Sequence, residues 1–233
     1  LYGGCLGRNM DVVGSSYASG NTCDSYFYGT VNINISGGRI ESNIYGAGAG
    51  GVTGYSPNSS DPYKNYGQEF DTGVEINITG GTYNLVEHGI MLISNSEKDS
   101  KIDGITLTSS YETTITNRGS GTLDIENSTI TSVESSGSGI VNLKSVIISN
   151  SVLGSYDKGT INIYGATIND GRIENNSLIN IYDINLNLTN DTIRNYGTVN
   201  VYGGTLVSSE TSPITNYNNN GVINIGTKDG NVS

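Results

Sequence analysis

A repeat of 43 residues constrains this chain more than any other feature of its sequence. Residues 1–43 and 44–86 are two copies of one unit, because the run Val-Asn-Ile-Asn-Ile-Ser-Gly-Gly at 31–38 returns as Val-Glu-Ile-Asn-Ile-Thr-Gly-Gly at 74–81. A fixed period over this length is typical of stacked supersecondary units, none of which can bury an apolar face alone. The sequence therefore predicts a solenoid.

The second half of the chain carries the same core at a shorter period. Residues 159–168 match residues 197–206 closely, and residues 121–130 match them well. After a first step of 43, equivalent positions recur every 18 to 24 residues, at Asn34, Asn77, Lys101, Asp124, Asn142, Asn162, Asn180, Asn200 and Asn224. We count the 43-residue unit as two turns and predict a single domain, 1–233, of about ten or eleven turns. Its two-turn repeats are 1–43 and 44–86, and its single-turn repeats fill 87–233.

Each turn has the pattern of three short strands. Apolar residues alternate with polar ones in the first strand, as at Val199 and Val201, which indicates a strand buried on one face. A second strand follows the glycines, and a third contains Ile-x-Asn, as at residues 193–195. Three strands in turns of varying length predict an all-β fold, a right-handed parallel β-helix, because a left-handed hexapeptide helix would keep its period far more strictly.

The Ile-x-Asn strands predict a buried ladder of amide side chains. If the isoleucine points inward, the asparagine two residues later does too, because side chains alternate along a strand. Asparagine also tolerates the left-handed backbone region and bonds neighbouring backbone groups. We therefore expect a structural ladder at one corner of the coil, made of Asn117, Asn175, Asn195 and Asn216.

The Tyr-Gly-Gly/Ala turns of residues 1–7 and 44–50, together with the Val-x-Ile-x-Ile-x-Gly-Gly runs, resemble the repeats of large bacterial cell-surface and secreted β-helix proteins. More broadly, the whole chain resembles the pectin-lyase-like superfamily of right-handed parallel β-helices. This resemblance implies the fold but not an activity, because the superfamily includes polysaccharide lyases, glycoside hydrolases, phage tailspikes, adhesins and passive stalks.

Composition limits where the protein can be located and which partners it can bind. Only 34% of residues are apolar and 14% are charged, so the exterior is mostly neutral and polar. The formal net charge of −11 disfavours nucleic acid, which needs a basic footprint. No apolar stretch approaches transmembrane length, so we expect no membrane insertion within this segment. With the resemblance, this predicts an extracellular, cell-surface or secreted protein, of which the chain is an excerpt because its repeat is already in phase at residue 1.

The two cysteines, Cys5 and Cys23, both fall in the first repeat unit. A disulfide between them would form in an oxidising compartment, and two free thiols are the equally open alternative. The sequence lacks both Cys-x-x-Cys spacing and clustering of cysteine with histidine, so it predicts no metal site and no cofactor.

Lyases of the superfamily that this chain resembles use a carboxylate-bound Ca²⁺ and a base, and its hydrolases use clustered aspartates. Such a cluster would place acidic residues in one column of successive turns. Asp103 and Glu126 do share an outward column, but Lys144 follows them, which indicates a surface charge ladder. His88, the single histidine, has no evident orienting partner. We therefore expect no catalytic residue, and the alternative is a carbohydrate-active enzyme, either a polysaccharide lyase or a glycoside hydrolase.

One outward column is aromatic in three consecutive turns, at Tyr164, Tyr182 and Tyr202. Rings spaced ~4.8 Å apart by the strands would offer apolar faces beside polar neighbours, which makes the row a candidate glycan-binding surface. A ladder that stabilises strand stacking is the competing interpretation. Together these patterns predict a noncatalytic structural or adhesive segment, acting as a stalk or as a contact surface for glycans or host surface proteins.

Overall fold

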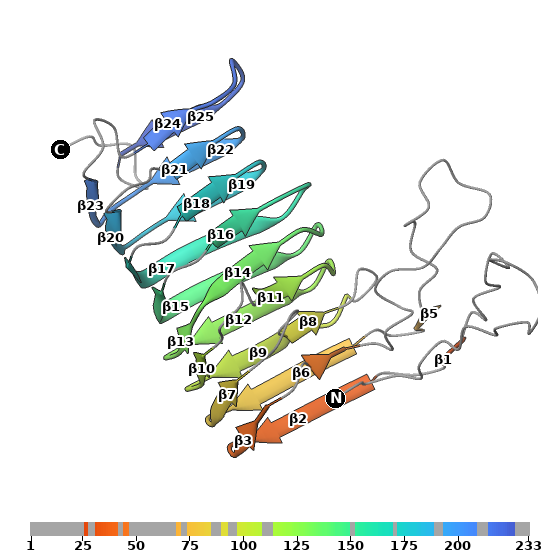
Figure 1. Cartoon of the computed structure of the whole chain (residues 1–233). Helices are drawn as coiled ribbons and strands as arrows, with labels where there is room; N and C mark the ends of the chain where they lie inside the picture. The colour runs from red at the N-terminus through yellow and green to blue at the C-terminus, as the bar shows by residue number, and fades with distance from the viewer. Residues whose placement is uncertain are drawn as a thin grey trace, which may run out of the picture.

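The computed structural model describes residues 26–27, 31–41, 44–46, 69–70, 74–84, 90–92, 97–108, 114–149, 152–169, 172–188, 193–208 and 214–226. Within these ranges every regular element is a β-strand, and none is a helix. Successive turns stack from β2 to β25 with parallel pairing between neighbouring turns (Figure 1). The fold is therefore an all-β parallel solenoid, as the strand pattern predicted.

Each turn contributes strands to three positions. The first position holds β2 (Val31–Ser36), β6 (Val74–Thr79), β9 (Ser100–Asp103), β12 (Thr122–Glu126), the first halves of β15 (Ile140–Ser149) and β17 (Thr160–Asn169), β19 (Leu178–Ile181), β22 (Thr198–Val201) and β25 (Val222–Ile225). The second holds β3 (Arg39–Ile40), β7 (Thr82–Asn84), β10 (Thr106–Thr108), β13 (Thr129–Ile130), the second halves of β15 and β17, β20 (Ile184–Leu188) and β23 (Thr205–Ser208).

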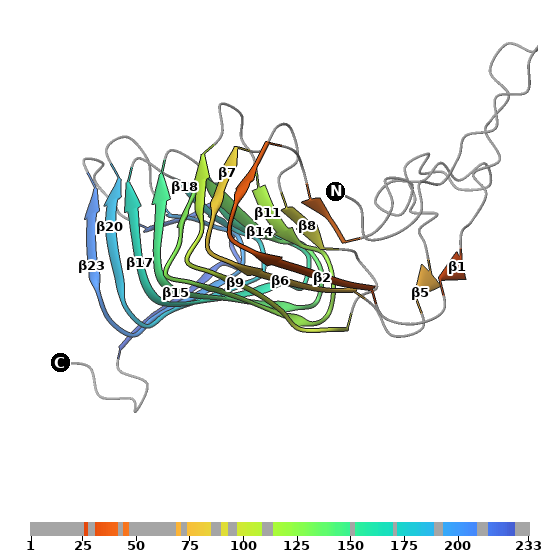
Figure 2. The same ribbon diagram turned by 90° about the horizontal axis from the view of Figure 1, so that it is seen from below.

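The third position holds β4 (Ile44–Tyr45), β8 (Ile90–Leu92), β11 (Thr114–Asn117), β14 (Ser132–Ser135), β16 (Val152–Ser155), β18 (Arg172–Asn175), β21 (Ile193–Asn195) and β24 (Ile214–Asn216). The short strands β1 (Tyr26–Phe27) and β5 (Glu69–Phe70) pair with each other. Figure 2 shows strands of the second position, such as β23, β20 and β17, running side by side.

The core consists of columns of branched aliphatic side chains that run along the axis of the solenoid. Ile161, Ile179 and Val199 lie opposite one another in β17, β19 and β22, and each is fully buried. The alternation of apolar and polar residues turns one face of each strand inward, and burying such a side chain contributes about 1.5–3 kcal/mol. Every turn therefore depends on its neighbours to cover its apolar edge.

Strand pairing confirms that the nine aligned sequence positions are equivalent. Asn34 lies opposite Asn77, Asn77 lies opposite Lys101, and the series continues in register to Asn224. The count of ten or eleven turns is wrong, however. Val31 lies directly opposite Val74, so the 43-residue unit advances the coil by one turn rather than two. The regular part, from β9 to β24, contains about six turns.

The corner between the first and second strands uses a left-handed backbone in several turns. Gly80 and Gly104 have φ of 67° and 66°, a region in which glycine carries no steric penalty. Asn127 and Ser145 occupy the same corner in the next two turns, with φ of 48° and 55°. Gly165, one turn further, does not have a positive φ of this kind, and the register of β15 on β17 shifts beside it. The corner thus changes its geometry between β15 and β17.

Candidate functional site

The Ile-x-Asn asparagines line one inner corner of the coil. Asn117, Asn175 and Asn195 are buried, whereas Asn216 is exposed. The amide nitrogen of Asn175 donates to Oδ1 of Asn195 at 2.7 Å, and the amide nitrogen of Asn195 donates to Oδ1 of Asn216 at 2.7 Å. A ladder of amides therefore joins three successive turns.

Two serines separate Asn117 from the other members of this inner column. Ser135 and Ser155 are fully buried between them in the strand register. Ser155 Oγ donates to the carbonyl oxygen of Gly159 at 2.7 Å, much as Asn117 Nδ2 donates to that of Gly121 at 3.1 Å. Either residue type can thus tie down the turn that follows the third strand, which is a structural role.

A second amide ladder lies on the outside of the first strands, and the sequence reasoning missed it. Each later side chain donates through Nδ2 to Oδ1 of the preceding one at 2.7–3.2 Å. The bonds run from Asn77 to Asn34, and then through the continuous series Asp124, Asn142, Asn162, Asn180, Asn200 and Asn224. The recurrence of asparagine at these aligned positions was the signal, because side chains about one strand spacing apart are within hydrogen-bonding reach.

The charged column beside this ladder is a surface network. Glu126 lies opposite Asp103 and Lys144, as predicted, and its two carboxylate oxygens accept from Lys101 Nζ and Lys144 Nζ at 2.8 Å each. Hydrogen bonds from Lys101 and then from Lys144 lower the pKa of Glu126 to about 2. The carboxylate is thus held ionised by two ammonium groups, the opposite of what a general acid needs.

Two glutamates on the outer face of the third strands lie on either side of Gly154. Glu134 and Glu174 are in register with this glycine from the two neighbouring turns. Burial raises the pKa of Glu134, and the nearby Arg118 opposes that rise. The ring of Tyr156 lies over Gly154, because a methyl group there would approach the ring to 2.4 Å. The ring therefore fills the space above the glycine that separates the two carboxylates.

The three outward tyrosines stack on one another. The ring centroids of Tyr164 and Tyr182 are 4.6 Å apart with planes 5° apart, and those of Tyr182 and Tyr202 are 5.0 Å apart with planes 22° apart. Both faces of the Tyr182 ring are consequently covered by its neighbours. The row presents ring edges and hydroxyls, and Tyr164, which is 45% exposed, begins the stack with its ring covered by Tyr182 on one face. This geometry favours the structural interpretation of the row and leaves Tyr164 as its member best suited to a ligand.

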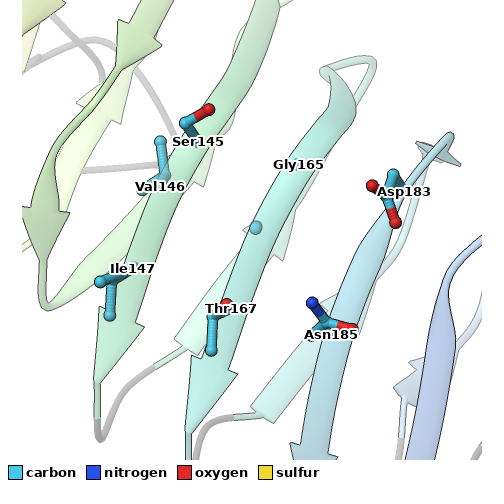
Figure 3. Close-up of a pocket in the computed structure, with 8 residues that line it drawn as sticks. Ser145, Val146, Ile147, Gly165, Thr167, Asp183 and Asn185 are labelled. Carbon is cyan, nitrogen blue, oxygen red and sulfur yellow. The ribbon is translucent and has the colours of Figure 1, made fainter.

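A shallow groove opens at the corner where β15 and β17 change register. We call it the corner groove; it has a volume of about 290 Å³ and is lined by Ser145, Val146, Ile147, Gly165, Ala166, Thr167, Asp183 and Asn185. Figure 3 shows three neighbouring turns contributing to it, with Ile147, Thr167 and Asn185 in one row along the axis. Gly165 has no side chain and leaves its centre open.

The sequence reasoning missed the corner groove. The only available signal was the loss of the Gly or Asn corner residue at Ser145, since the groove depends on a register shift that no residue pattern states.

Cys5, Cys23 and His88 fall outside the described residues. Among the residues that are described, no three His, Cys, Asp or Glu side chains are grouped to hold a metal ion. None of the described ranges contains a helix that could cross a membrane.

The fold and its surface define a class, the parallel β-solenoids with polar axial ladders. No family model matches the chain, and neither a curated protein nor a solved structure matches it.

Proposed function

We propose that the chain is a noncatalytic structural segment of a bacterial surface or secreted protein, a stalk whose side serves as a contact surface for glycans or host surface proteins. The observation that carries this proposal is the continuity of its axial ladders. The outer amide ladder joins every turn from Asp124 to Asn224 without a break. A stalk has to pass load from one turn to the next, and ladders of this kind connect neighbouring turns side chain to side chain.

The proposal also covers the handedness of the coil and the superfamily to which the fold belongs. A right-handed coil and a relationship to the pectin-lyase-like superfamily are supported by the three-strand turns of uneven length and by the Val-x-Ile-x-Ile-x-Gly-Gly runs. An extracellular location is supported by an acidic exterior rich in uncharged polar side chains, which keeps an exposed solenoid soluble.

The contact surface is assigned to the corner groove and the neighbouring Tyr164. The groove combines hydroxyl, amide, carboxylate and aliphatic groups within a small volume, and Tyr164 precedes Gly165 in the same strand. Concave sites with a few polar groups among apolar ones are the usual form of a ligand site.

Two measurements on the purified chain test the proposal. Binding is measured on an array of glycans and host surface proteins, with a Tyr164→Ala, Tyr182→Ala, Tyr202→Ala variant of unchanged far-UV circular dichroism beside the wild type. Incubation with polysaccharides is followed for new reducing ends and for unsaturated products. We expect binding without turnover; turnover would refute the noncatalytic role, and binding to nothing on the array would refute the contact role.

A further inference from the structure

The corner groove lies on an uncharged strip of the solenoid. The one charged strand residue described in the second position is Arg39 of β3, which lies opposite Thr82 at the N-terminal end of the stack. No Asp, Glu, Lys or Arg occurs in the described strands β7, β10, β13, β20 and β23 or in the second halves of β15 and β17. Their outward residues in one column are Thr82, Thr106, Thr129, Ile147, Thr167, Asn185 and Thr205. In a chain of net charge −11, this strip therefore offers a neutral ligand a surface on which few charged groups have to lose their hydration.

The groove presents two kinds of surface at once. The hydroxyls of Ser145 and Thr167 and the amide of Asn185 donate and accept hydrogen bonds. Ile147, which is 44% exposed, adds an aliphatic wall in the same row. A pyranose ring has the matching pair of surfaces, since its edge carries hydroxyls and its face carries C–H groups.

The charges around the groove select against acidic ligands. Asp183 is exposed at the rim and contributes a carboxylate, which accepts hydrogen bonds from hydroxyl groups but repels uronates. The nearest lysine in the strand, Lys144, is engaged by Glu126 at 2.8 Å and by Asp124 at 3.9 Å. No cationic side chain lines the groove to balance an acidic sugar.

We propose that the corner groove binds a neutral saccharide whose chain runs along the axis of the solenoid. This inference rests on the proposed contact function and names its ligand class. Ile147, Thr167 and Asn185 come from successive turns, so their contact points repeat every ~4.8 Å along the axis. An extended chain of pyranoses repeats on a similar scale, and it meets one turn with each ring. The groove is shallow, with a volume of about 290 Å³, so we expect a single groove to bind such a chain weakly.

The chain offers a variant that closes the groove without straining the backbone. A methyl group at Gly165 would meet the Ser145 nitrogen at 3.5 Å, an ordinary contact. Gly165→Ala is therefore expected to fold like the wild type, and Gly165→Gln to place a longer side chain across the opening. Thr106→Ala, an exposed threonine in the same column but outside the groove, is the matched control.

The test is a titration of the full chain, followed by NMR and calorimetry, with neutral gluco-, xylo- and manno-oligosaccharides and with oligogalacturonates. We expect the wild type and Thr106→Ala to bind a neutral series alike, Gly165→Ala to bind it less tightly and Gly165→Gln to lose at least tenfold in affinity. Asp183→Asn should weaken neutral binding several-fold and narrow the discrimination against oligogalacturonates. A far-UV circular dichroism spectrum identical to that of the wild type shows that each variant is folded.

The outcomes separate this inference from the function on which it rests. Neutral binding that survives Gly165→Gln overturns the assignment to the groove, and a preference for oligogalacturonates overturns the ligand class. A chain that binds host proteins on the array but no saccharide overturns the saccharide assignment while the contact function stands. A chain that binds nothing in either experiment overturns both.

Discussion

Replacing Asn195 by alanine should destabilise the solenoid far more than replacing Asn200, although each side chain has one amide neighbour on either side. Asn195 is fully buried, bonded to Asn175 and Asn216 at 2.7 Å, and its amide nitrogen also lies 3.0 Å from the carbonyl oxygen of Val222. Alanine would remove these bonds and leave the buried polar groups that bond to Asn195 without its amide as a partner. At about 1 kcal/mol for each of these three lost bonds and 1–3 kcal/mol for a buried group left unsatisfied, the cost is about 4–6 kcal/mol.

The outer amide provides the comparison. Asn200 donates to Asn180 and accepts from Asn224, both at 2.7 Å, but it is only partly buried. Water can replace both partners, so Asn200→Ala should cost only about 0.5–1.5 kcal/mol. Asn195→Ser should fall between the two alanine variants, because Ser155 occupies the same inner column one turn before Asn175 and still bonds the local turn.

The assay is urea denaturation followed by far-UV circular dichroism, with the midpoint and the slope fitted separately, since an unchanged slope assigns a shifted midpoint to stability. Equal losses for Asn195→Ala and Asn200→Ala would show that the inner ladder is no more desolvated than the outer one. That result would refute the reasoning from burial.

Three further predictions concern single positions. Glu126 has a pKa of 4.5 when unfolded and about 2 when folded, so the stability that its carboxylate contributes to the fold is complete above pH 4.5 and is lost as the pH falls towards 2. Over this pH range the urea midpoint of Glu126→Gln should therefore fall less steeply than that of the wild type. Gly204→Ala should lower the thermal midpoint strongly, because φ is 104° and the added methyl would lie 2.5 Å from the Ile184 backbone, and a midpoint matching that of Gly165→Ala would contradict the corner geometry. Ser145→Gly should raise the free energy of unfolding by about 1 kcal/mol by relieving its left-handed backbone, which a lowered denaturation midpoint would disprove.

The sequence was sufficient for the strand positions but not for the number of turns. The alignment of Asn34 with Asn77 and of Asn162 with Asn180 held in the strand register, because period-two burial fixes which residues face the core. The turn count failed because spacing alone does not tell whether 43 residues advance the coil by one turn or by two. Val31 lies opposite Val74, so these two positions belong to adjacent turns.

The surface was harder to predict than the core. The tyrosine column was found, but the stacking of Tyr182 between Tyr164 and Tyr202 follows from ring orientation, which side-chain parity does not determine. The corner groove depends on the sign of φ at Ser145 and on the register shift that accompanies it. The sign of this φ and the register shift are properties of the backbone, so the residue pattern within one turn did not contain them.

The outer amide ladder makes the turn an interchangeable part. Every bond in it has the same sense, from the later side chain to the earlier one, and Asn180 and Asn200 are 20 residues apart. Excising residues 178–197 would bring Asn200 onto Asn162 with donor and acceptor already matched, and Tyr202 onto Tyr164. Insertion of a turn follows the same logic in reverse. Recombination between its own repeats can thus lengthen or shorten such a segment by whole turns, while the hydrogen bonds between the remaining turns are unchanged.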